Sequence, residues 1–291
     1  MTDFSHILLA SDFTERSQNA EQRILQLLHI GFKELHLLHV LSGSLMEELK
    51  RLVSGGMDTR LHEMAKQRLQ EQASRFAGIA GLKVECQLEV GRPYAVIIER
   101  ATETDSLIVM GAHGGHAVRD WVQGSMVERI LSSSRQPFLV VKQPAKGPYQ
   151  RVLAPVDFSA SSAAAVASAL KVAPNAEIVL LNVFEVPFES KLRFAGISDA
   201  ELTGYRDSSR QQAERDMAAF IRTLPDSGAN LSSRLEFGYA PERILEQAEQ
   251  SACDLIVMGR YGKSGMEQLL LGSVTEYVTT TCDCDVMVVG L

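Results

Sequence analysis

The sequence lacks an apolar run of about 18 residues, the length that a membrane-spanning helix needs. Its first residues include an acid and have no basic segment of the kind that opens a secretory signal peptide. Cysteine is scarce, with four in 291 residues, and such usage suits a reducing compartment. We therefore expect a cytoplasmic protein that has no membrane segment.

An excess of positive charge is also missing, because the formal net charge is -7. Residues 1–150 hold 17 basic and 17 acidic side chains, whereas residues 151–291 hold 12 basic and 19 acidic ones. Neither half offers the basic surface that DNA or RNA binding requires, so we expect no nucleic-acid partner. The sequence also lacks a P-loop and has no Gly-x-Gly-x-x-Gly after its first strand pattern.

What the sequence does have is enough apolar material for a core, with 45% hydrophobic and 22% charged residues. It also repeats itself: "HILLASDFTERS" (6–17) aligns with "RVLAPVDFSASS" (151–162), and "TDSLIVMGAHG" (104–114) aligns with "CDLIVMGRYG" (253–262). The aligned segments lie a whole domain length apart, which indicates two copies of one domain instead of the short repeats of a solenoid. We predict one domain over residues 1–145 and a second over 150–291, joined by the linker "QPAKGPYQ".

Each copy alternates short Val-, Ile- and Leu-rich strands with amphipathic helices, which predicts an α/β fold. Buried strands of this kind are typical of a parallel sheet that helices cover on both faces. The stretch 45–78 predicts one long helix or two helices separated at Gly55-Gly56. A charged amphipathic helix is predicted over 206–222, and the segment 185–202 before it is predicted to be a loop, with a flap over the second site as one role.

Three glycines and a serine recur at the same spacing in both halves, as Gly-x2-Gly-x9-Gly-Ser. The first glycine follows the fourth strand pattern, and an acid, Asp12 or Asp157, follows the first strand pattern. In a doubly wound sheet, ligands bind where the connections from neighbouring strands depart in opposite directions. Glycine backbone and a helix N-terminus suit phosphate, and the acid suits ribose hydroxyls. The pattern favours a nucleotide site, and a packing role for the glycines is the alternative.

These motifs resemble those of the ATP-binding universal stress protein family in its tandem form. "APVDFS" with "GRYGKSGMEQLLLGSV" is a close match. "ASDFT" with "GAHGGHAVRDWVQGSM" departs from it by Ala10 in place of a frequent proline and by Gly115 in place of a basic residue. The resemblance covers essentially the whole chain. It implies two Rossmann-like domains, each a five-stranded parallel sheet of order 3-2-1-4-5 with helices on both faces.

The resemblance also implies which residues hold an adenine nucleotide in each half. In the first half they are Asp12, Val40, Met110, Gly111, Gly114, Gly124, Ser125 and Met126. In the second half they are Pro155, Asp157, Val183, Met258, Gly259, Gly262, Gly272, Ser273 and Val274. ATP is the expected ligand, with AMP or ADP as alternatives and Mg²⁺ as an accompanying ion. From this placement, valine at Gly259 and Gly272 is expected to abolish binding at the second site and to leave the fold intact.

Three functions stay open at this point. The first is a nucleotide-binding protein of stress response or signalling, the second a nucleotide-free interaction scaffold, and the third a slow ATPase. Efficient phosphoryl transfer needs a metal clamp and a base, and the sequence shows no clustered carboxylates for them, so we expect weak hydrolysis at most and assign no catalytic residue. The resemblance also implies that the last strands, 138–142 and 286–290, pair within the chain as a pseudo-dimer, with a homodimer of chains as a further alternative.

Other chemistry-bearing residues give weaker signals. His113 and His116 lie three apart in the first glycine loop, where they could contact phosphate; no third metal ligand is evident, so no metal site is predicted. His36 and His39 are expected on opposite faces of a strand. The pair Cys282 and Cys284 has no partner in the sequence and is expected to be inert. Trp121 is the single tryptophan and is expected to pack.

Overall fold

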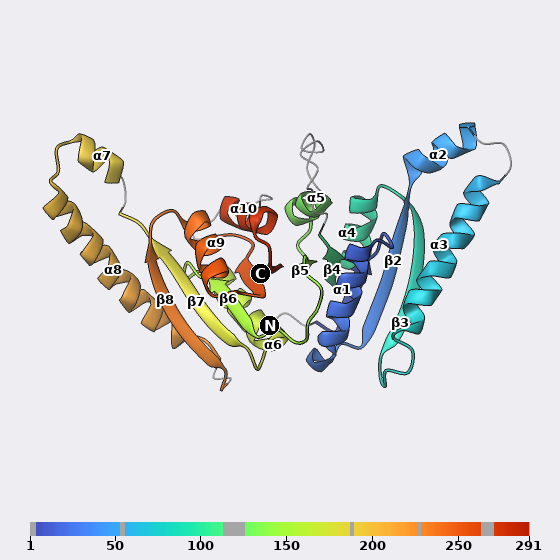
Figure 1. Cartoon of the computed structure of the whole chain (residues 1–291), viewed down its shortest axis with the longest axis horizontal. Helices are drawn as coiled ribbons and strands as arrows, with labels where there is room; N and C mark the ends of the chain where they lie inside the picture. The colour runs from blue at the N-terminus through green and yellow to red at the C-terminus, as the bar shows by residue number, and fades with distance from the viewer. Residues whose placement is uncertain are drawn as a thin grey trace. The chain divides into compact units, whose positions relative to one another are not determined.

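The computed structural model describes residues 4–52, 56–112, 126–186, 189–225, 228–262 and 271–290. Among these residues, one compact unit ends at Pro148 and a second begins at Tyr149. Figure 1 shows the helices and strands of both units along the chain. Each unit is described by itself below.

The first unit is a parallel sheet whose strand order is β3-β2-β1-β4-β5. Helices α1 and α3 pack on one face of this sheet, and α4 and α5 lie on the other. Its elements, in chain order, are β1 (His6–Ala10), α1 (Glu15–Gln26), the short 3-10 helix η1 (Leu28–Ile30), β2 (Glu34–Ser42), α2 (Gly43–Leu52), α3 (Met57–Ser74), β3 (Lys83–Gly91), α4 (Pro93–Glu103), β4 (Leu107–Gly111), α5 (Met126–Ser133) and β5 (Phe138–Val141).

The second unit repeats this arrangement with the strand order β8-β7-β6-β9-β10. Helices α6 and α8 pack on one face, and α9 and α10 on the other. Its elements are β6 (Arg151–Pro155), α6 (Ala160–Val172), β7 (Glu177–Phe184), α7 (Glu189–Phe194), α8 (Asp199–Ile221), β8 (Asn230–Phe237), α9 (Ala240–Gln250), β9 (Leu255–Gly259), α10 (Ser273–Thr281) and β10 (Asp285–Val289). The predicted α/β class and strand order are confirmed in both units.

The central strands are buried on both faces, as their continuous apolar sequences predict. In β1, Ile7, Leu8 and Leu9 are fully buried, and Ile7 aligns with Leu35 of β2 on one side and Leu107 of β4 on the other. Placing the first and fourth strands side by side brings their carboxyl ends together. This is the edge of the sheet at which the sequence places the ligand.

Unusual backbone conformations recur at equivalent positions of the two units. Phe13 and Phe158, directly after the two acids, have φ angles of 62° and 65°. Asp105 and Ala252, in the turns before β4 and β9, have φ angles of 47° and 45°. Non-glycine residues seldom adopt positive φ, so these shared conformations show that the duplication preserved backbone detail as well as topology.

The predicted loop over residues 185–202 is wrong, because the structure has helix α7 there and α8 begins at Asp199. The start of α8 is fixed by a capping box: Ser198 Oγ accepts a hydrogen bond from Glu201 N–H at 3.3 Å, and the Glu201 carboxylate accepts one from Ser198 N–H at 2.9 Å. The sequence "SDAE" carries this signal, which an apolar periodicity search overlooks. By contrast, the predicted break between helices near Gly55-Gly56 agrees with α2 and α3, since Gly56 has φ 75°.

Candidate functional site

The first-strand acid of the first unit organises the loop in which it lies. Asp12 Oδ1 accepts hydrogen bonds from Thr14 N–H at 3.0 Å and from Thr14 Oγ1 at 2.6 Å, and it also accepts from the Ser17 hydroxyl. Ser17 Oγ in turn accepts from Asp12 N–H at 3.1 Å. This closed set of bonds holds Phe13 in its left-handed conformation and directs the chain from β1 into α1.

The second unit builds the same loop around Asp157. Asp157 Oδ1 accepts from Ser159 N–H at 3.1 Å and from Ser162 Oγ at 2.5 Å, and Asp157 N–H donates to Ser162 Oγ at 3.1 Å. Ser159 Oγ also caps α6 by accepting from Ser162 N–H at 3.2 Å. In both halves one carboxylate oxygen therefore has a structural role, and Asp157 is only half-buried at the carboxyl end of the sheet.

A side chain from the second strand ties each loop to the sheet. In the first unit His39 Nδ1 donates to Ser11 O at 2.7 Å, and the His39 ring stacks on Phe13 with centroids 4.3 Å apart. In the second unit Asn182 Nδ2 donates to Val156 O at 2.8 Å. The tie is thus an imidazole in one half and an amide in the other, at equivalent positions.

The first glycine of each motif permits close packing of a helix on the end of a strand. A Cβ atom at Gly111 would lie 2.4 Å from Arg16 O and 2.5 Å from Arg16 C, in the first turn of α1. A Cβ atom at Gly259 would lie 2.3 Å from Ser161 Oγ and 2.9 Å from Ser161 C, in the first turn of α6. Real Cβ atoms essentially never lie this close to another atom, so a side chain at either glycine would force the neighbouring helix to shift.

The second glycine of the motif lies next to the first-strand acid, as expected if the ends of the first and fourth strands form one site. A Cβ atom at Gly262 would lie 2.8 Å from Asp157 Oδ2, so the glycine backbone and the carboxylate are immediate neighbours. Gly262 itself is exposed. The structure therefore brings together the ends of β6 and β9 at one open point, between the acid and the glycine motif.

The third glycine positions the start of α10. Gly272 N–H donates to Arg260 O at 3.0 Å, and Thr275 Oγ1 donates to Gly259 O at 3.0 Å. These two bonds fix the first turn of the helix against the end of β9. Gly272 is the N-cap residue and provides no capping side chain, while Ser273 is exposed at the first helical position. The N–H groups of a first turn have no partner within their own helix, and their partial positive charge favours an anion.

The other expected ligand residues fall at the predicted strand ends. Val40 and Val183 lie near the ends of β2 and β7, Pro155 ends β6, and Met110 and Met258 are buried just before the motif glycines. Met126 begins α5, and Val274 lies in the first turn of α10. The expected residues Gly114, Gly124 and Ser125, together with His113, His116 and Trp121, lie outside the described residues.

A model of the universal stress protein family matches the chain twice, over residues 3–142 and 148–290. The chain belongs to the universal stress protein family. Universal stress protein MJ0577 of Methanocaldococcus jannaschii is 30% identical over 156 residues, which are 48% of this chain and 94% of that protein. Universal stress protein MJ0531 of the same organism is 27% identical over 141 residues, 48% of this chain and 82% of that protein.

The tandem arrangement also has a structural counterpart. A universal stress protein from Archaeoglobus fulgidus superposes over 99% of this chain and 98% of its own, with a TM-score of 0.67 and 22% sequence identity. At that identity the likeness supports the fold alone. Within the residues described, no helix of this universal stress protein is long and apolar enough to cross a membrane.

Sequence reasoning missed the partners of the two acids. Ser17 and Ser162 complete the loops of Asp12 and Asp157, and His39 and Asn182 tie those loops to the sheet. The signal was available in "DFTERS" and "DFSASS", where the acid is followed five residues later by serine. His39 and Asn182 occupy equivalent positions and both donate a hydrogen bond, but they are different residue types. Comparing the two halves of the sequence therefore does not reveal their common role.

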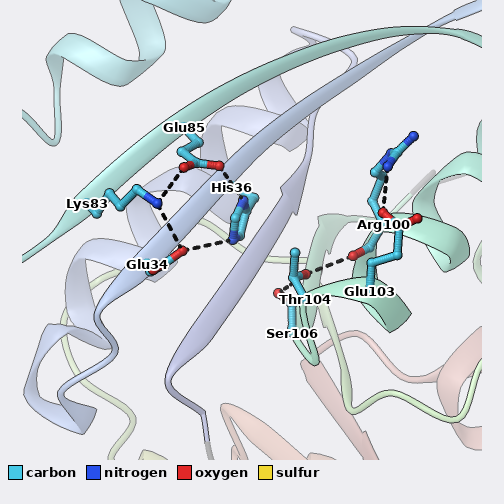
Figure 2. Close-up of polar contacts among 8 residues, drawn as sticks. All are labelled: Glu34, His36, Lys83, Glu85, Arg100, Glu103, Thr104 and Ser106. Carbon is cyan, nitrogen blue, oxygen red and sulfur yellow. Dashed lines mark hydrogen bonds and ion pairs between the residues drawn. The ribbon is translucent and has the colours of Figure 1, made fainter.

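His36 and His39 do not act together, as expected from their spacing. His39 contacts Ser11 and Phe13, whereas His36 lies between Glu34 and Glu85, with ring nitrogens 3.6 Å and 3.5 Å from their carboxylate oxygens. Figure 2 shows this cluster, in which Lys83 Nζ also pairs with Glu85 at 2.6 Å and with Glu34 at 3.6 Å. In the same view Thr104 bonds to Arg100 O at 2.8 Å and to Ser106 at 2.7 Å, which fixes the turn between α4 and β4.

Burial of His36 predicts a loss of stability in acid. Desolvation lowers the pKa of His36 below its ordinary value, and it outweighs the attraction of Glu85 and Glu34. A group with a depressed folded-state pKa binds its proton more readily when unfolded, so its contribution to stability is complete above about pH 6.5 and declines as the pH falls below that value. We expect His36→Phe to reduce the stability lost between pH 7.5 and pH 5, measured by urea unfolding at each pH.

The matched control is His62→Phe, which removes an exposed histidine from the same unit. It should retain the acid response of the wild-type protein. Equal losses of stability in the wild type and in His36→Phe would contradict the assignment of the acid response to His36.

Proposed function

We propose that this protein binds an adenine nucleotide in each half, at the crevice between the first and fourth strands, and serves in stress response or signalling through that binding. ATP is the expected ligand, with AMP and ADP as alternatives. The observation that carries the proposal is the meeting of Asp157 and Gly262 at the ends of β6 and β9, beside a helix whose N-terminus has no side-chain cap.

The second unit supplies complementary groups for the two ends of a nucleotide. Asp157 has its Oδ1 engaged with Ser159 and Ser162, while its Oδ2 lies beside Gly262. A carboxylate placed there suits the hydroxyls of ribose, which donate hydrogen bonds. The first turn of α10, with exposed Ser273, suits the phosphates because exposed N–H groups and the helix dipole favour negative charge.

The first unit repeats the sugar-binding part of this arrangement. Asp12 holds its loop through the same bonds as Asp157, and Asp12 is exposed at the carboxyl end of β1. The start of α5 at Met126 follows the fourth strand in the chain as α10 does in the second unit. We therefore propose two sites per chain, one in each half.

Mg²⁺ would enter with the nucleotide. Over the described ranges, no group of three His, Cys, Asp or Glu side chains is placed to hold a metal ion. Mg²⁺ is commonly bound through substrate phosphates and few protein carboxylates, which fits an MgATP complex. Nucleotide occupancy would alter signalling only to the extent that two states of the protein differ in their affinity for it.

The proposal is tested by identifying what the purified protein carries and what it binds. Small molecules extracted from protein purified under mild conditions should include adenine nucleotide, at up to two per chain, when analysed by liquid chromatography and mass spectrometry. Nucleotide-free protein should then bind ATP in isothermal titration calorimetry with and without Mg²⁺, with GTP as the comparison. No adenine nucleotide in the extract together with no heat on adding ATP and Mg²⁺ would overturn the proposal.

A further inference from the structure

A buried glutamine in the last turn of α3 reaches the loop that carries Asp12 in the first unit. Gln72 is 5% exposed, and its Nε2 donates to Ser11 Oγ at 3.1 Å and to Glu21 Oε2 at 3.2 Å. Because an ionised carboxylate only accepts hydrogen bonds, the contact with Glu21 fixes the amide with its nitrogen toward both oxygens. One side chain of α3 therefore joins α1 to the residue directly before Asp12.

Ser11 transmits this contact to the backbone of the loop. Its Oγ also accepts a hydrogen bond from Phe13 N–H at 3.2 Å, and its carbonyl oxygen accepts the one from His39. A hydroxyl oxygen has two lone pairs, so Gln72 and Phe13 together fill its capacity as an acceptor. Since Ser11 and Phe13 flank Asp12 in the chain, the bond from Gln72 acts on the backbone on both sides of the acid.

A polar side chain at position 72 is costly for the fold. Within the described residues Gln72 Oε1 is buried without a hydrogen-bond partner. Glu21 is 1% exposed, and its charge is balanced by Arg75, whose Nη1 lies 2.9 Å from Glu21 Oε1. An apolar side chain at position 72 would leave no carbonyl unsatisfied, so packing alone does not explain a glutamine there. The contacts of Nε2 with the loop and with Glu21 account for it.

The second unit links the corresponding loop and helix with different chemistry. Val156 takes the place of Ser11, so its side chain offers no acceptor to an amide. Phe158 packs on Phe220 of α8, with ring centroids 5.8 Å apart. A hydrogen bond requires a narrow range of distance and angle, whereas apolar contact is not directional. The link from helix to loop is therefore polar and directional in the first unit and apolar in the second.

We propose that Gln72 is a positioning residue of the first nucleotide site, which holds Ser11 and, through Ser11, the orientation of Asp12 toward the ribose. This inference rests on the proposed function and adds α3 to the elements that define the site. The ATP affinity of the first site then depends on residue 72, and that of the second site does not. Binding of ATP in turn restrains α3, because an energetic coupling is reciprocal.

The test measures the ATP affinity of each half separately, by hydrogen-exchange mass spectrometry of peptides that cover residues 6–17 and 151–162 during a titration. Gln72→Met removes the amide and keeps the length of the side chain. It should weaken the first site about five-fold, the effect of one hydrogen bond, and leave the second site unchanged. Gln67→Met is the matched control, because Gln67 is exposed on the same helix and bonds to Glu71 at 2.9 Å. It should bind ATP in both halves as the parent chain does.

A double variant shows whether Gln72 acts through Ser11. Ser11→Ala removes the acceptor, so adding Gln72→Met to it should cause no further loss of affinity at the first site. Unchanged first-site affinity in Gln72→Met, or losses that multiply in the double variant, would overturn this inference and leave the proposed function in place. A parent chain that binds no ATP would overturn both.

A measurement on the parent chain keeps the inference testable if a variant fails to fold, which far-ultraviolet circular dichroism detects. Saturating ATP should slow amide exchange in the last turn of α3, around Gln72, together with exchange in the loop at residues 11–17. Protection of the loop without any change in α3 would show that the two are not linked.

Discussion

Gly111→Ala is expected to lower the free energy of unfolding of the first unit by about 3 kcal/mol, at the upper end of the cost of overpacking a core. The added methyl group would lie 2.4 Å from Arg16 O and 2.5 Å from Arg16 C, and both atoms belong to the backbone of α1. Because a backbone cannot rotate away as a side chain can, α1 would have to shift from β4. Urea unfolding followed by far-ultraviolet circular dichroism measures the change.

Gly43→Ala is the matched control in the same unit. Gly43 begins helix α2, and its Cβ would lie 3.8 Å from Gly91 Cα, an ordinary contact distance. Alanine is the better helix former, so we expect this variant to match or slightly exceed wild-type stability. Similar unfolding midpoints for Gly111→Ala and Gly43→Ala would show that the close approach of Arg16 to position 111 does not exclude a side chain there.

The same geometry corrects an expectation drawn from the sequence. Valine at Gly259 was expected to block phosphate and spare the fold, but its Cβ would lie 2.3 Å from Ser161 Oγ and 2.9 Å from Ser161 C. A loss of nucleotide binding in that variant would therefore follow from disturbed packing of α6 on β9. A test of the phosphate site has to leave this glycine unchanged.

Ser273→Asp is expected to weaken ATP binding at the second site by about 2 kcal/mol, roughly thirty-fold in affinity. Ser273 is exposed at the first position of α10, and a carboxylate there would repel the phosphates that we propose to bind at this helix end. The same charge interacts favourably with the helix dipole, so the helix itself should not lose stability. Titration calorimetry measures the affinity, and thermal unfolding checks the fold.

Ser273→Asn separates charge from size in this experiment. Asparagine and aspartate have nearly the same shape, so the neutral variant should retain most of the affinity that the acidic one loses. Wild-type affinity for ATP in both variants would place the phosphates elsewhere. Equal losses in both would instead point to a steric effect at the helix end.

The fold was largely readable from the sequence because it rests on repeated local patterns. The repeated segments at 6–17 and 104–114 contain β1 (His6–Ala10) and β4 (Leu107–Gly111), and the break predicted at Gly55-Gly56 falls between α2 and α3. The early start of α8 depends on the capping box of Ser198 and Glu201, which stabilises the first turn through polar contacts alone. Periodicity cannot detect an element that a local polar contact begins.

The candidate site was predictable in position and less so in the roles of its residues. The meeting of Asp157 with Gly262 follows from strand order and could be anticipated. The sequence left a packing role for the glycines as an alternative, but a spacing pattern does not show that α1 and α6 approach Gly111 and Gly259 so closely. The bonds of Ser17 and Ser162 likewise depend on a left-handed residue between acid and serine, which no propensity favours at phenylalanine.

The different tethers at His39 and Asn182 give the two halves different chemistry. An amide keeps its hydrogen bond to Val156 O at every pH, whereas an imidazole gains a positive charge when it takes up a second proton. Burial lowers the pKa of His39, so this charging begins only in moderately acidic surroundings. Acidification therefore adds a positive charge to the loop tie of the first unit and leaves the tie of the second unit unchanged, so a fall in pH distinguishes two halves that share one backbone plan.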